Sequence, residues 1–225
     1  MNTIFFTTSI HDKTLSLVDQ EAVHCALVLR KKVGDIIQVI DGKGNIYKCG
    51  IDQMSRRTVL CTIIQCQFYA QTEQITIAVA PTKNRDRLEW MIEKLVEIGV
   101  SSIILLQTTN TERNRTNYER LEKKAISAVK QSLRFYIPPI KEMEFEDLIK
   151  QDYFNKFIAH CHSEFEGNKQ MPISSGNTLI LIGPEGDFTE QEVKLALNHN
   201  FISLNLGAHR LRTETAAIVA VAKFQ

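Results

Sequence analysis

Two short segments near the end of the chain carry glycines and charged residues of types that could do chemistry. The first, Gly183-Pro184-Glu185-Gly186, follows an apolar run and precedes a helix with a capping signal. Such a turn is typical of the carboxyl end of a strand, where α/β folds bind ligands, and its glycines let a flat ligand approach the backbone. An ordinary tight turn has the same composition, so this segment alone leaves both interpretations open.

The second segment has the same order of strand, glycine and helix. Leu206-Gly207 ends an apolar run, and Leu211-Arg212-Thr213-Glu214 then enters a helix. A helix cap needs only a threonine hydroxyl, whereas the charged Arg212 and Glu214 in apolar surroundings indicate a ligand or a partner subunit. We therefore expect the two strand ends to face one another and to form one binding site.

The elements that must position these segments alternate between strands and helices from about residue 74 onward, as βαβ units do. Residues 85–99 predict a helix, because apolar side chains recur at i, i+3 and i+4 and Gly99 stands at its end. We expect strands at residues 74–80, 102–106, 157–161, 179–182 and 202–206, and further helices at residues 118–134, 189–199 and 213–224. The polar residues 163–176 predict a mobile loop.

The first 70 residues follow a different pattern. Residues 35–40, 45–51 and 58–64 predict strands, and Asp41-Gly42-Lys43-Gly44 is a hairpin turn signal. Helical spacing of apolar residues is confined to residues 21–30. The sequence therefore predicts a small β-barrel over residues 1–70 and an α/β domain over residues 71–225.

Composition excludes several classes of protein. The 27 basic and 26 acidic side chains leave a net charge of +1, which rules out a basic coat over the whole surface but not a local basic face. Basic residues do cluster, at Arg30-Lys31-Lys32, Arg56-Arg57, Lys83/Arg85/Arg87 and Arg113/Arg115. Each cluster alone is typical of solvated surface charge, whereas the four together are consistent with the phosphate-binding face that an RNA ligand would require. No apolar run is long enough to span a membrane and no signal peptide is recognisable, so we expect a cytoplasmic protein.

Cysteine and histidine spacing does not predict a metal site. The 5 cysteines form no Cys-x-x-Cys pair. Cys25, Cys49, Cys61 and Cys66 stand among apolar or strand-like neighbours, which is typical of reduced, buried thiols. In His160-Cys161-His162, a strand would put the two histidines on one face and the cysteine on the other, and no second ligand pair follows at zinc spacing. We therefore expect no bound metal.

Taken together, Ile182-Gly183-Pro184-Glu185-Gly186, Leu206-Gly207 and Leu211-Arg212-Thr213-Glu214-Thr215 make the sequence recognisable. It resembles the ribosomal RNA small subunit methyltransferase E family, which methylates N3 of a uridine in 16S ribosomal RNA and belongs to the knotted SPOUT methyltransferases. Earlier matches include Glu97-Ile98-Gly99-Val100 and Gln131-Ser132 with Arg134. The resemblance covers nearly the whole chain.

The resemblance implies a fold, a cofactor and partners. The fold is a PUA-like β-barrel followed by a SPOUT α/β domain with a C-terminal trefoil knot; the partners are 16S ribosomal RNA and a second copy of the chain. The cofactor is S-adenosylmethionine. Carried onto this sequence, its binding residues are Ala159, His160, Ile182, Gly183, Pro184, Glu185, Gly186, Leu206, Gly207, Leu211, Arg212 and Thr213.

The sequence also departs from the family in places. Many members have an arginine in the first strand, where this chain has Asn2-Thr3-Ile4. Asp187 stands where a glycine is frequent, a change that we expect to be neutral.

Two residues are expected to take part in the reaction. Arg212 would stabilise the negative charge that develops when the uridine loses its N3 proton. Glu214 would orient Arg212 or accept the proton; the alternative is a helix-start carboxylate at the dimer interface.

We expect RNA to lie across both domains, bound by Arg30, Lys31, Lys83, Arg85 and Arg134. Two alternative functions remain open from the sequence. One is a SPOUT methyltransferase that acts on transfer RNA, and the other is a catalytically silent RNA-binding assembly factor.

Overall fold

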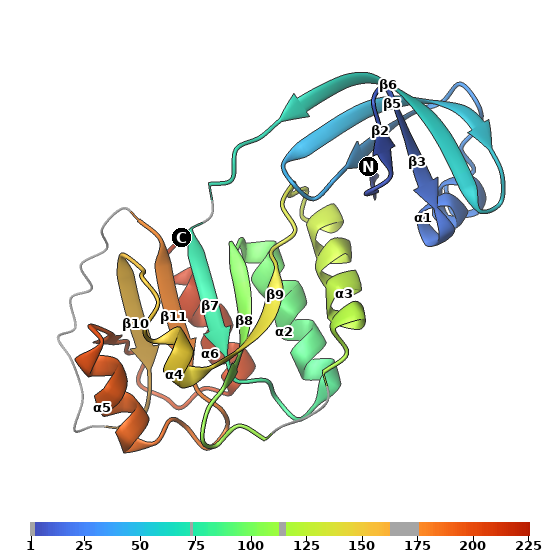
Figure 1. The fold of residues 1–225 in the computed structure, drawn as a ribbon. Coiled ribbons are helices and arrows are strands. Elements are labelled where there is room, and N and C mark those ends of the chain that lie inside the picture. Colours follow the sequence, from blue (N-terminus) through green and yellow to red (C-terminus); the bar gives the residue numbers. More distant parts are fainter. Residues whose placement is uncertain (1–2, 73, 113–115, 163–175) are drawn as a thin grey trace. The chain divides into compact units, whose positions relative to one another are not determined.

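The computed structural model describes residues 3–72, 74–112, 116–162 and 176–225. The chain forms two compact units, residues 1–71 with 126–137 and residues 72–125 with 138–225 (Figure 1). Each unit is built on its own six-stranded sheet. Helix α3 (Tyr118–Gln131) contributes residues to both units. The predicted division into domains at residue 70 stays a prediction.

The first unit is a mostly antiparallel sheet with one short helical segment. Its strands are β1 (Ile4–Phe6), β2 (Ile10–His11), β3 (Thr14–Val18), β4 (Ile36–Ile40), β5 (Asn45–Met54) and β6 (Thr58–Phe68), in the order β1-β4-β5-β6-β3-β2. The helical segment is α1 (Asp19–Val23), which continues as the π-helical turn η1 (His24–Val28). Only the β1–β4 pair is parallel among the strand pairs of this sheet that the described residues form.

The core of this unit comes from one face of the sheet. Along β3, β4 and β6, buried side chains alternate with more exposed ones, as in a sheet with one face toward water. Cys25, Cys49 and Cys61 are buried among these apolar side chains as free thiols. The prediction of buried, reduced cysteines is confirmed for these three, whereas Cys66 and Cys161 are exposed.

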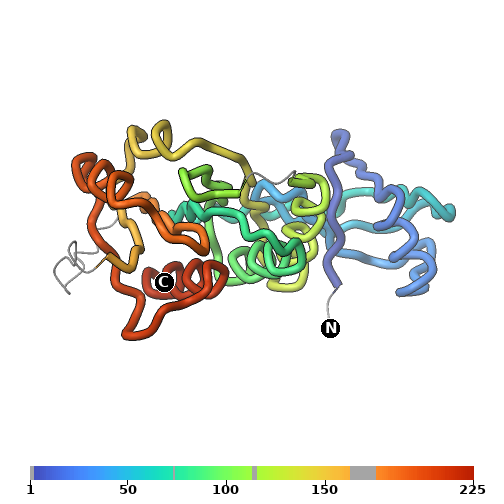
Figure 2. Tube along the Cα trace, turned by 90° about the horizontal axis from the view of Figure 1, so that it is seen from below, coloured from blue at the N-terminus to red at the C-terminus, as the bar shows by residue number. Residues whose placement is uncertain are grey.

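The second unit is a parallel sheet covered by helices on both faces (Figures 1 and 2). Its strands are β7 (Ile75–Val79), β8 (Ser102–Gln107), β9 (Ile140–Glu144), β10 (Asn155–Ala159), β11 (Thr178–Ile182) and β12 (Ile202–Ser203), in the order β12-β10-β11-β7-β8-β9. Every strand pair described in this sheet is parallel. The predicted α/β class is therefore confirmed.

The strands of this sheet are buried on both faces. All five residues of β7 and of β11 are buried, which explains why these segments read as continuous apolar runs. Helices α4 (Phe145–Leu148) and α5 (Glu190–Asn198) pack on one face. Helix α6 (Thr213–Ala222) packs on β7, β11 and helix α2 (Arg85–Ile98) on the other face. No helix among the described residues is long and apolar enough to cross a membrane.

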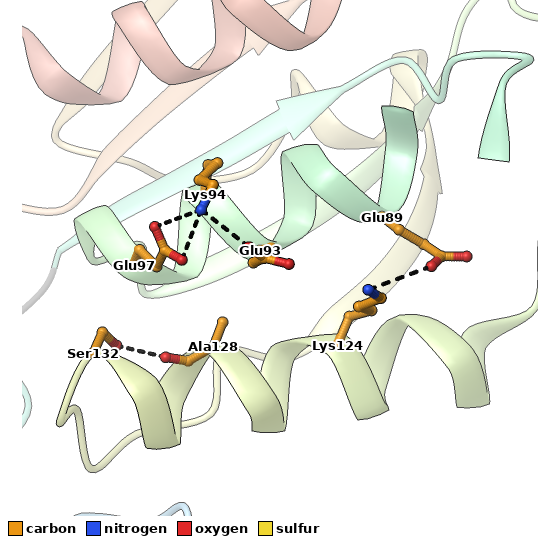
Figure 3. Close-up of polar contacts among 7 residues, drawn as sticks. All are labelled: Glu89, Glu93, Lys94, Glu97, Lys124, Ala128 and Ser132. Atoms are coloured by element: carbon orange, nitrogen blue, oxygen red, sulfur yellow. Dashed lines mark hydrogen bonds and ion pairs between the residues drawn. The ribbon is translucent and has the colours of Figure 1, made fainter. Parts of the chain in front are cut away.

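Helix α2 begins and ends where its sequence predicts. The Asn84 side chain accepts hydrogen bonds from the backbone N–H groups of Asp86 and Arg87, and Gly99 ends the helix with a φ of 93°. Figure 3 shows α2 beside α3, with Lys94 contacting two glutamates of its own helix. Glu89 is buried and forms ion pairs with Arg120 and Lys124 of α3.

Several element boundaries differ from the sequence predictions. The predicted strand at residues 157–161 ends at Ala159, and that at residues 202–206 ends at Ser203. The predicted helix at residues 21–30 is split into α1 and η1. Strand β9 and helix α4 have no counterpart among the elements expected from the sequence. The mobile loop predicted at residues 163–176 and the Arg113/Arg115 cluster lie largely or wholly outside the described residues. The trefoil knot stays a prediction.

Candidate functional site

A pocket of about 800 Å³ lies in the second unit at the carboxyl ends of β10, β11 and β12. This is the edge at which open parallel sheets bind ligands. The segment after β11 and the segment that enters α6 both line it, so the two glycine-bearing strand ends do meet in one site. Arg87 of α2 completes the lining on another side.

Most of the predicted cofactor-binding residues line this pocket. They are Ala159, His160, Ile182, Gly183, Pro184, Glu185, Leu206, Gly207, Leu211, Arg212 and Thr213. Gly186 is not among the lining residues, although its neighbours are. That these residues bind a cofactor stays a prediction.

Gly183 is required by packing within the protein. A Cβ atom at Gly183 would lie 3.0 Å from Cδ2 and 3.1 Å from the backbone nitrogen of Phe188. Phe188 is buried in the sheet core and cannot move away cheaply. The glycine therefore lets the chain turn tightly over Phe188, which is a different reason from the close ligand approach expected from the sequence.

Gly207 has the opposite surroundings. Its φ is 145°, a conformation that favours glycine, and no atom lies within 4 Å of the place of a Cβ. The Asn205 side chain accepts a hydrogen bond from the Gly207 N–H at 2.8 Å, and Lys223 of the C-terminal segment donates to the Asn205 carbonyl at 3.0 Å. The backbone at Gly207 is thus fixed in place with open space in front of it.

Asp187 connects two of the segments that form the pocket. Its Oδ2 accepts a hydrogen bond from the Cys161 N–H after β10 at 2.8 Å, and its Oδ1 accepts one from the Phe188 N–H at 2.8 Å. Its φ of 65° is one that glycine adopts more easily. The carboxylate offsets that backbone strain by joining the loops after β10 and β11, a role that the sequence did not reveal.

His160 and His162 are engaged in hydrogen bonds at the pocket wall. His162 donates through Nε2 to the Phe188 carbonyl at 2.7 Å, and its backbone N–H donates to Nδ1 of His160 at 3.2 Å. Since His160 accepts at Nδ1, a neutral ring carries its hydrogen on Nε2, which lies 2.9 Å from the Ser203 hydroxyl.

Burial and the Asp187 carboxylate raise the pKa of the neighbouring Cys161 thiol, although Arg210 lowers it. Within residues 3–72, 74–112, 116–162 and 176–225, no three His, Cys, Asp or Glu side chains are grouped as metal ligands.

The two predicted catalytic residues lie in different surroundings. Arg212 lines the pocket, is exposed, and occupies the N-cap position of α6. Glu214 is buried, and its Oε1 lies 3.8 Å from Nε of Arg87 rather than against Arg212. The prediction that Glu214 orients Arg212 therefore has no contact in its support, and Arg87 is the cation that Glu214 faces.

Further polar contacts join the segment after β11 to the start of α6. The Thr213 hydroxyl donates to the Gly183 carbonyl at 3.3 Å, and Arg210 donates to the Glu185 carbonyl at 3.4 Å. Arg87 Nη1 lies 4.0 Å from Glu185 Oε1. In the sequence Arg87 belongs to a basic cluster, and no local pattern places it in the site, because its partners are about 100 residues away along the chain.

The predicted RNA-binding residues divide between the two units. Arg30, Lys31 and Arg134 belong to the first unit, and Lys83 and Arg85 belong to the second. Lys83 and Glu112 form an exposed ion pair, and the hydrogen bond to Glu112 raises the Lys83 pKa. RNA binding by these residues stays a prediction.

Comparison with known proteins assigns the chain to a class and then to a family. Residues 70–225 match the family model of an RNA methyltransferase domain, and residues 17–64 match that of an RNA methyltransferase PUA domain. The fold and the two models thus define an RNA methyltransferase with a PUA domain. A ribosomal RNA small subunit methyltransferase E of Rickettsia conorii is 32% identical over 99% of this chain and 94% of its own, and one of Bacillus subtilis is 29% identical over 92% and 88%. The chain belongs to the ribosomal RNA small subunit methyltransferase E family.

Solved structures have the same fold over the whole chain. A probable rRNA-methyltransferase from Porphyromonas gingivalis is 36% identical, with a TM-score of 0.91 over 98% of this chain and 96% of its own. A ribosomal RNA small subunit methyltransferase E from Neisseria gonorrhoeae, bound to S-adenosyl methionine, is 25% identical, with a TM-score of 0.88 over 100% and 97%. The resemblance stated from the sequence motifs is thereby confirmed.

Proposed function

We propose that this protein uses S-adenosylmethionine to methylate N3 of a uridine in 16S ribosomal RNA. The observation that carries the proposal is the pocket where residues 183–185 and 211–213 meet at the carboxyl ends of three parallel strands. Membership of the ribosomal RNA small subunit methyltransferase E family supports the reaction and the RNA substrate. The relative from Neisseria gonorrhoeae, which is bound to S-adenosyl methionine, supports the cofactor.

The residues present suit this cofactor. A volume of about 800 Å³ lies within the range of small-molecule sites. Gly207 presents a backbone with open space in front of it, and Ile182, Leu206 and Leu211 supply apolar surface for an adenine ring. When bound, the cofactor supplies an electrophilic methyl group on a sulfonium.

The chain's own residues must position the base and manage one proton. The uridine N3–H has to be removed, because a protonated imide nitrogen is a poor nucleophile, and the resulting negative charge spreads onto the flanking carbonyl oxygens. Arg212 lines the pocket with an exposed guanidinium and is our candidate to stabilise that charge. Because N3 lies on the base-pairing edge, the uridine must be unpaired or flipped out of a helix.

The decisive experiment is mass mapping of methylated nucleosides in 16S ribosomal RNA from cells with and without the gene. N3-methyluridine should disappear without the gene and return when purified protein and cofactor are added to small subunits. Calorimetry should give a millimolar or better affinity for S-adenosylmethionine. A protein that binds small subunits but not the cofactor would instead be a silent assembly factor, and methylation of transfer RNA alone would indicate the other alternative.

Two further parts of the proposal concern the oligomeric state of the protein and its location in the cell. We propose a homodimer formed through the second unit, with the apolar helix α6 and the exposed Trp90 of α2 as candidate contacts. Light scattering that reports a monomer at micromolar concentration would reject it. We also propose that the protein acts in the cytoplasm, because its substrate would be the small ribosomal subunit.

A further inference from the structure

The guanidinium of Arg87 is the point at which three segments of the pocket meet. Arg87 lies in the first turn of α2. Its Nη1 is 4.0 Å from Glu185 Oε1 in the segment after β11, and its Nε is 3.8 Å from Glu214 Oε1 in the first turn of α6. The Arg87 side chain thus connects α2 by ion pairs to both of the glycine-bearing segments that line the pocket.

Glu214 determines where this guanidinium lies. The Glu214 side chain is only 9% exposed, and removing a carboxylate from water to this extent has a desolvation cost that a nearby cation offsets. Arg87 is the cation that the described part of the chain provides for it. Glu214 is not among the pocket-lining residues, whereas Arg87 lines the pocket and is 39% exposed. Glu214 therefore acts on the pocket through Arg87.

The donors of Arg87 are available for a ligand. Distances of 3.8 and 4.0 Å are ion-pair distances and exceed hydrogen-bond reach. Among the described residues, no oxygen accepts a hydrogen bond from this guanidinium. Two carboxylates already balance the charge of this guanidinium, and its free N–H donors suit a neutral oxygen acceptor. A carbonyl oxygen of a base has that chemistry.

We propose that Arg87 donates a hydrogen bond to a carbonyl oxygen of the target uracil, and that Glu214 is a positioning residue for Arg87. The proposal rests on the proposed function, because it requires a uridine in this pocket. Two carbonyl groups flank N3, so Arg87 and Arg212 can each serve one of them. Loss of the N3 proton makes these oxygens more negative, and the hydrogen bond from a charged donor then strengthens.

The test uses the full-length protein with assembled small subunits. Arg87→Gln keeps hydrogen-bond donors but removes the charge, and Arg87→Lys keeps the charge but removes the planar fork. The matched control is Arg120→Gln, because Arg120 also pairs with a buried glutamate, Glu89, but lies on α3 away from the pocket lining. Figure 3 shows Glu89 with Lys124, its other partner. The measurements are kcat, KM for small subunits, cofactor affinity and the pH dependence of kcat.

We expect Arg87→Gln to lower kcat about 10- to 100-fold, with KM and cofactor affinity within two-fold of the unchanged protein. The rise of kcat with pH should also move to higher pH, because the deprotonated base loses a stabilising charge. Arg87→Lys should recover part of kcat and most of the pH profile. Arg120→Gln should leave all four measurements unchanged.

The pH comparison takes account of the other charged groups around Arg87. Glu185 and Glu214 face it directly, and Lys83 lies near Glu185. The pocket lining also holds His160, His162 and His209, and these residues are the same in the variant and in the unchanged protein. The shift between the two profiles therefore reports Arg87.

Glu214→Gln should lower kcat less than Arg87→Gln does. The kcat of the double variant should be no lower than that of Arg87→Gln alone, because both residues act through one guanidinium.

Three results would overturn the proposal: an Arg87→Gln variant as active as Arg120→Gln, a loss of cofactor affinity that matches the loss of kcat, or a raised KM with unchanged kcat. An unchanged protein that forms no N3-methyluridine would refute the proposed function, and this proposal with it. If Arg87→Gln does not fold, a normal kcat in Arg87→Lys and Glu214→Gln together would likewise overturn the proposal.

Discussion

The two sheets of this protein differ in where their charged and polar side chains are placed. In the first unit, strands β3, β4 and β6 bury alternate residues and leave one face open. In the second unit, β7 and β11 are buried completely, and the pocket is formed by the segments that follow the strands. We therefore expect substitutions at charged surface residues to change affinity for RNA, and substitutions in the strand-end segments to change chemistry or stability.

The largest effect is expected at the pocket of the second unit. Arg212→Ala should lower the rate of methyl transfer to small subunits by about 100- to 1000-fold, because a charged donor to the developing anion is lost. RNA binding, measured by filter retention, should change little. Near-normal turnover in this variant would assign the role elsewhere, with Arg210 the next residue of the lining to test.

Alanine substitutions at three glycines, two in the second unit and one in the first, should change the free energy of unfolding to different extents. Gly183→Ala should lower the free energy of unfolding by about 1–3 kcal/mol, because its Cβ would meet Phe188 at 3.0 Å. Gly186→Ala, whose nearest contact would be 3.7 Å away, should change it by less than about 0.5 kcal/mol. Gly50→Ala in β5 also meets only an ordinary contact and should be neutral or slightly stabilising. Urea unfolding measures all three, and equal losses at Gly183 and Gly186 would contradict the packing explanation.

Lysine substitutions should weaken RNA binding in both units by a smaller factor. Lys31→Ala and Lys83→Ala should each reduce affinity a few-fold and lower the slope of log K against log salt by about 1, with cofactor affinity unchanged. Lys48→Ala is the control in the first unit. Lys123→Ala is the control in the second, since Lys123 forms an exposed ion pair with Glu119 much as Lys83 does with Glu112. If the control substitutions weaken RNA binding as much as Lys31→Ala and Lys83→Ala do, the RNA is bound by the overall positive charge of the surface and not by a defined set of residues.

The last effect is confined to alkaline pH and concerns the buried thiols of the first unit. Burial raises the pKa of Cys49 and of Cys61 from 9.0 to about 12. Because these thiols lose their protons more easily in the unfolded chain, the stability that they contribute is present below pH 9 and is lost as the pH rises toward 12. Thermal unfolding between pH 8 and 11 should therefore show a smaller decline in the Cys49→Ala/Cys61→Ala double variant than in the unchanged protein. Parallel declines would show that other groups control alkaline unfolding.

The sequence predicted the elements whose signals are local. Helix α2 has an apolar stripe and a terminal glycine, and β7 and β11 are continuous apolar runs. It did not predict β9, because Ile140-Lys141-Glu142-Met143-Glu144 is a polar edge strand whose pairing with β8 is decided by the rest of the sheet. Helices and strands could therefore be predicted from the sequence where the intrinsic propensity of the residues agreed with their burial in the fold.

The candidate site, like the fold, could be predicted where its signal is local in the sequence. The glycine-bearing segments could be found, because they are contiguous in the sequence and resemble a family motif. The partners of Glu214 and Asp187 could not be found, because Arg87 and Cys161 reach them only through the strand order β12-β10-β11-β7. A residue's type and position indicate that it is charged near a helix start, but only the folded sheet determines which charge it meets.

The strand order also determines when the pocket can exist during protein synthesis. Strand β7 is the first strand of the second unit to leave the ribosome, yet it pairs with β11, and Ile75 lies opposite Thr178. The pocket further requires residues as late as Lys223. A nascent chain therefore lacks the complete pocket until Lys223 has left the ribosome. If the pocket is the proposed cofactor site, chains stalled with only residues 1–200 outside the ribosome should not retain labelled S-adenosylmethionine. On the proposed function, a growing copy could then not methylate the ribosome that is making it before that point.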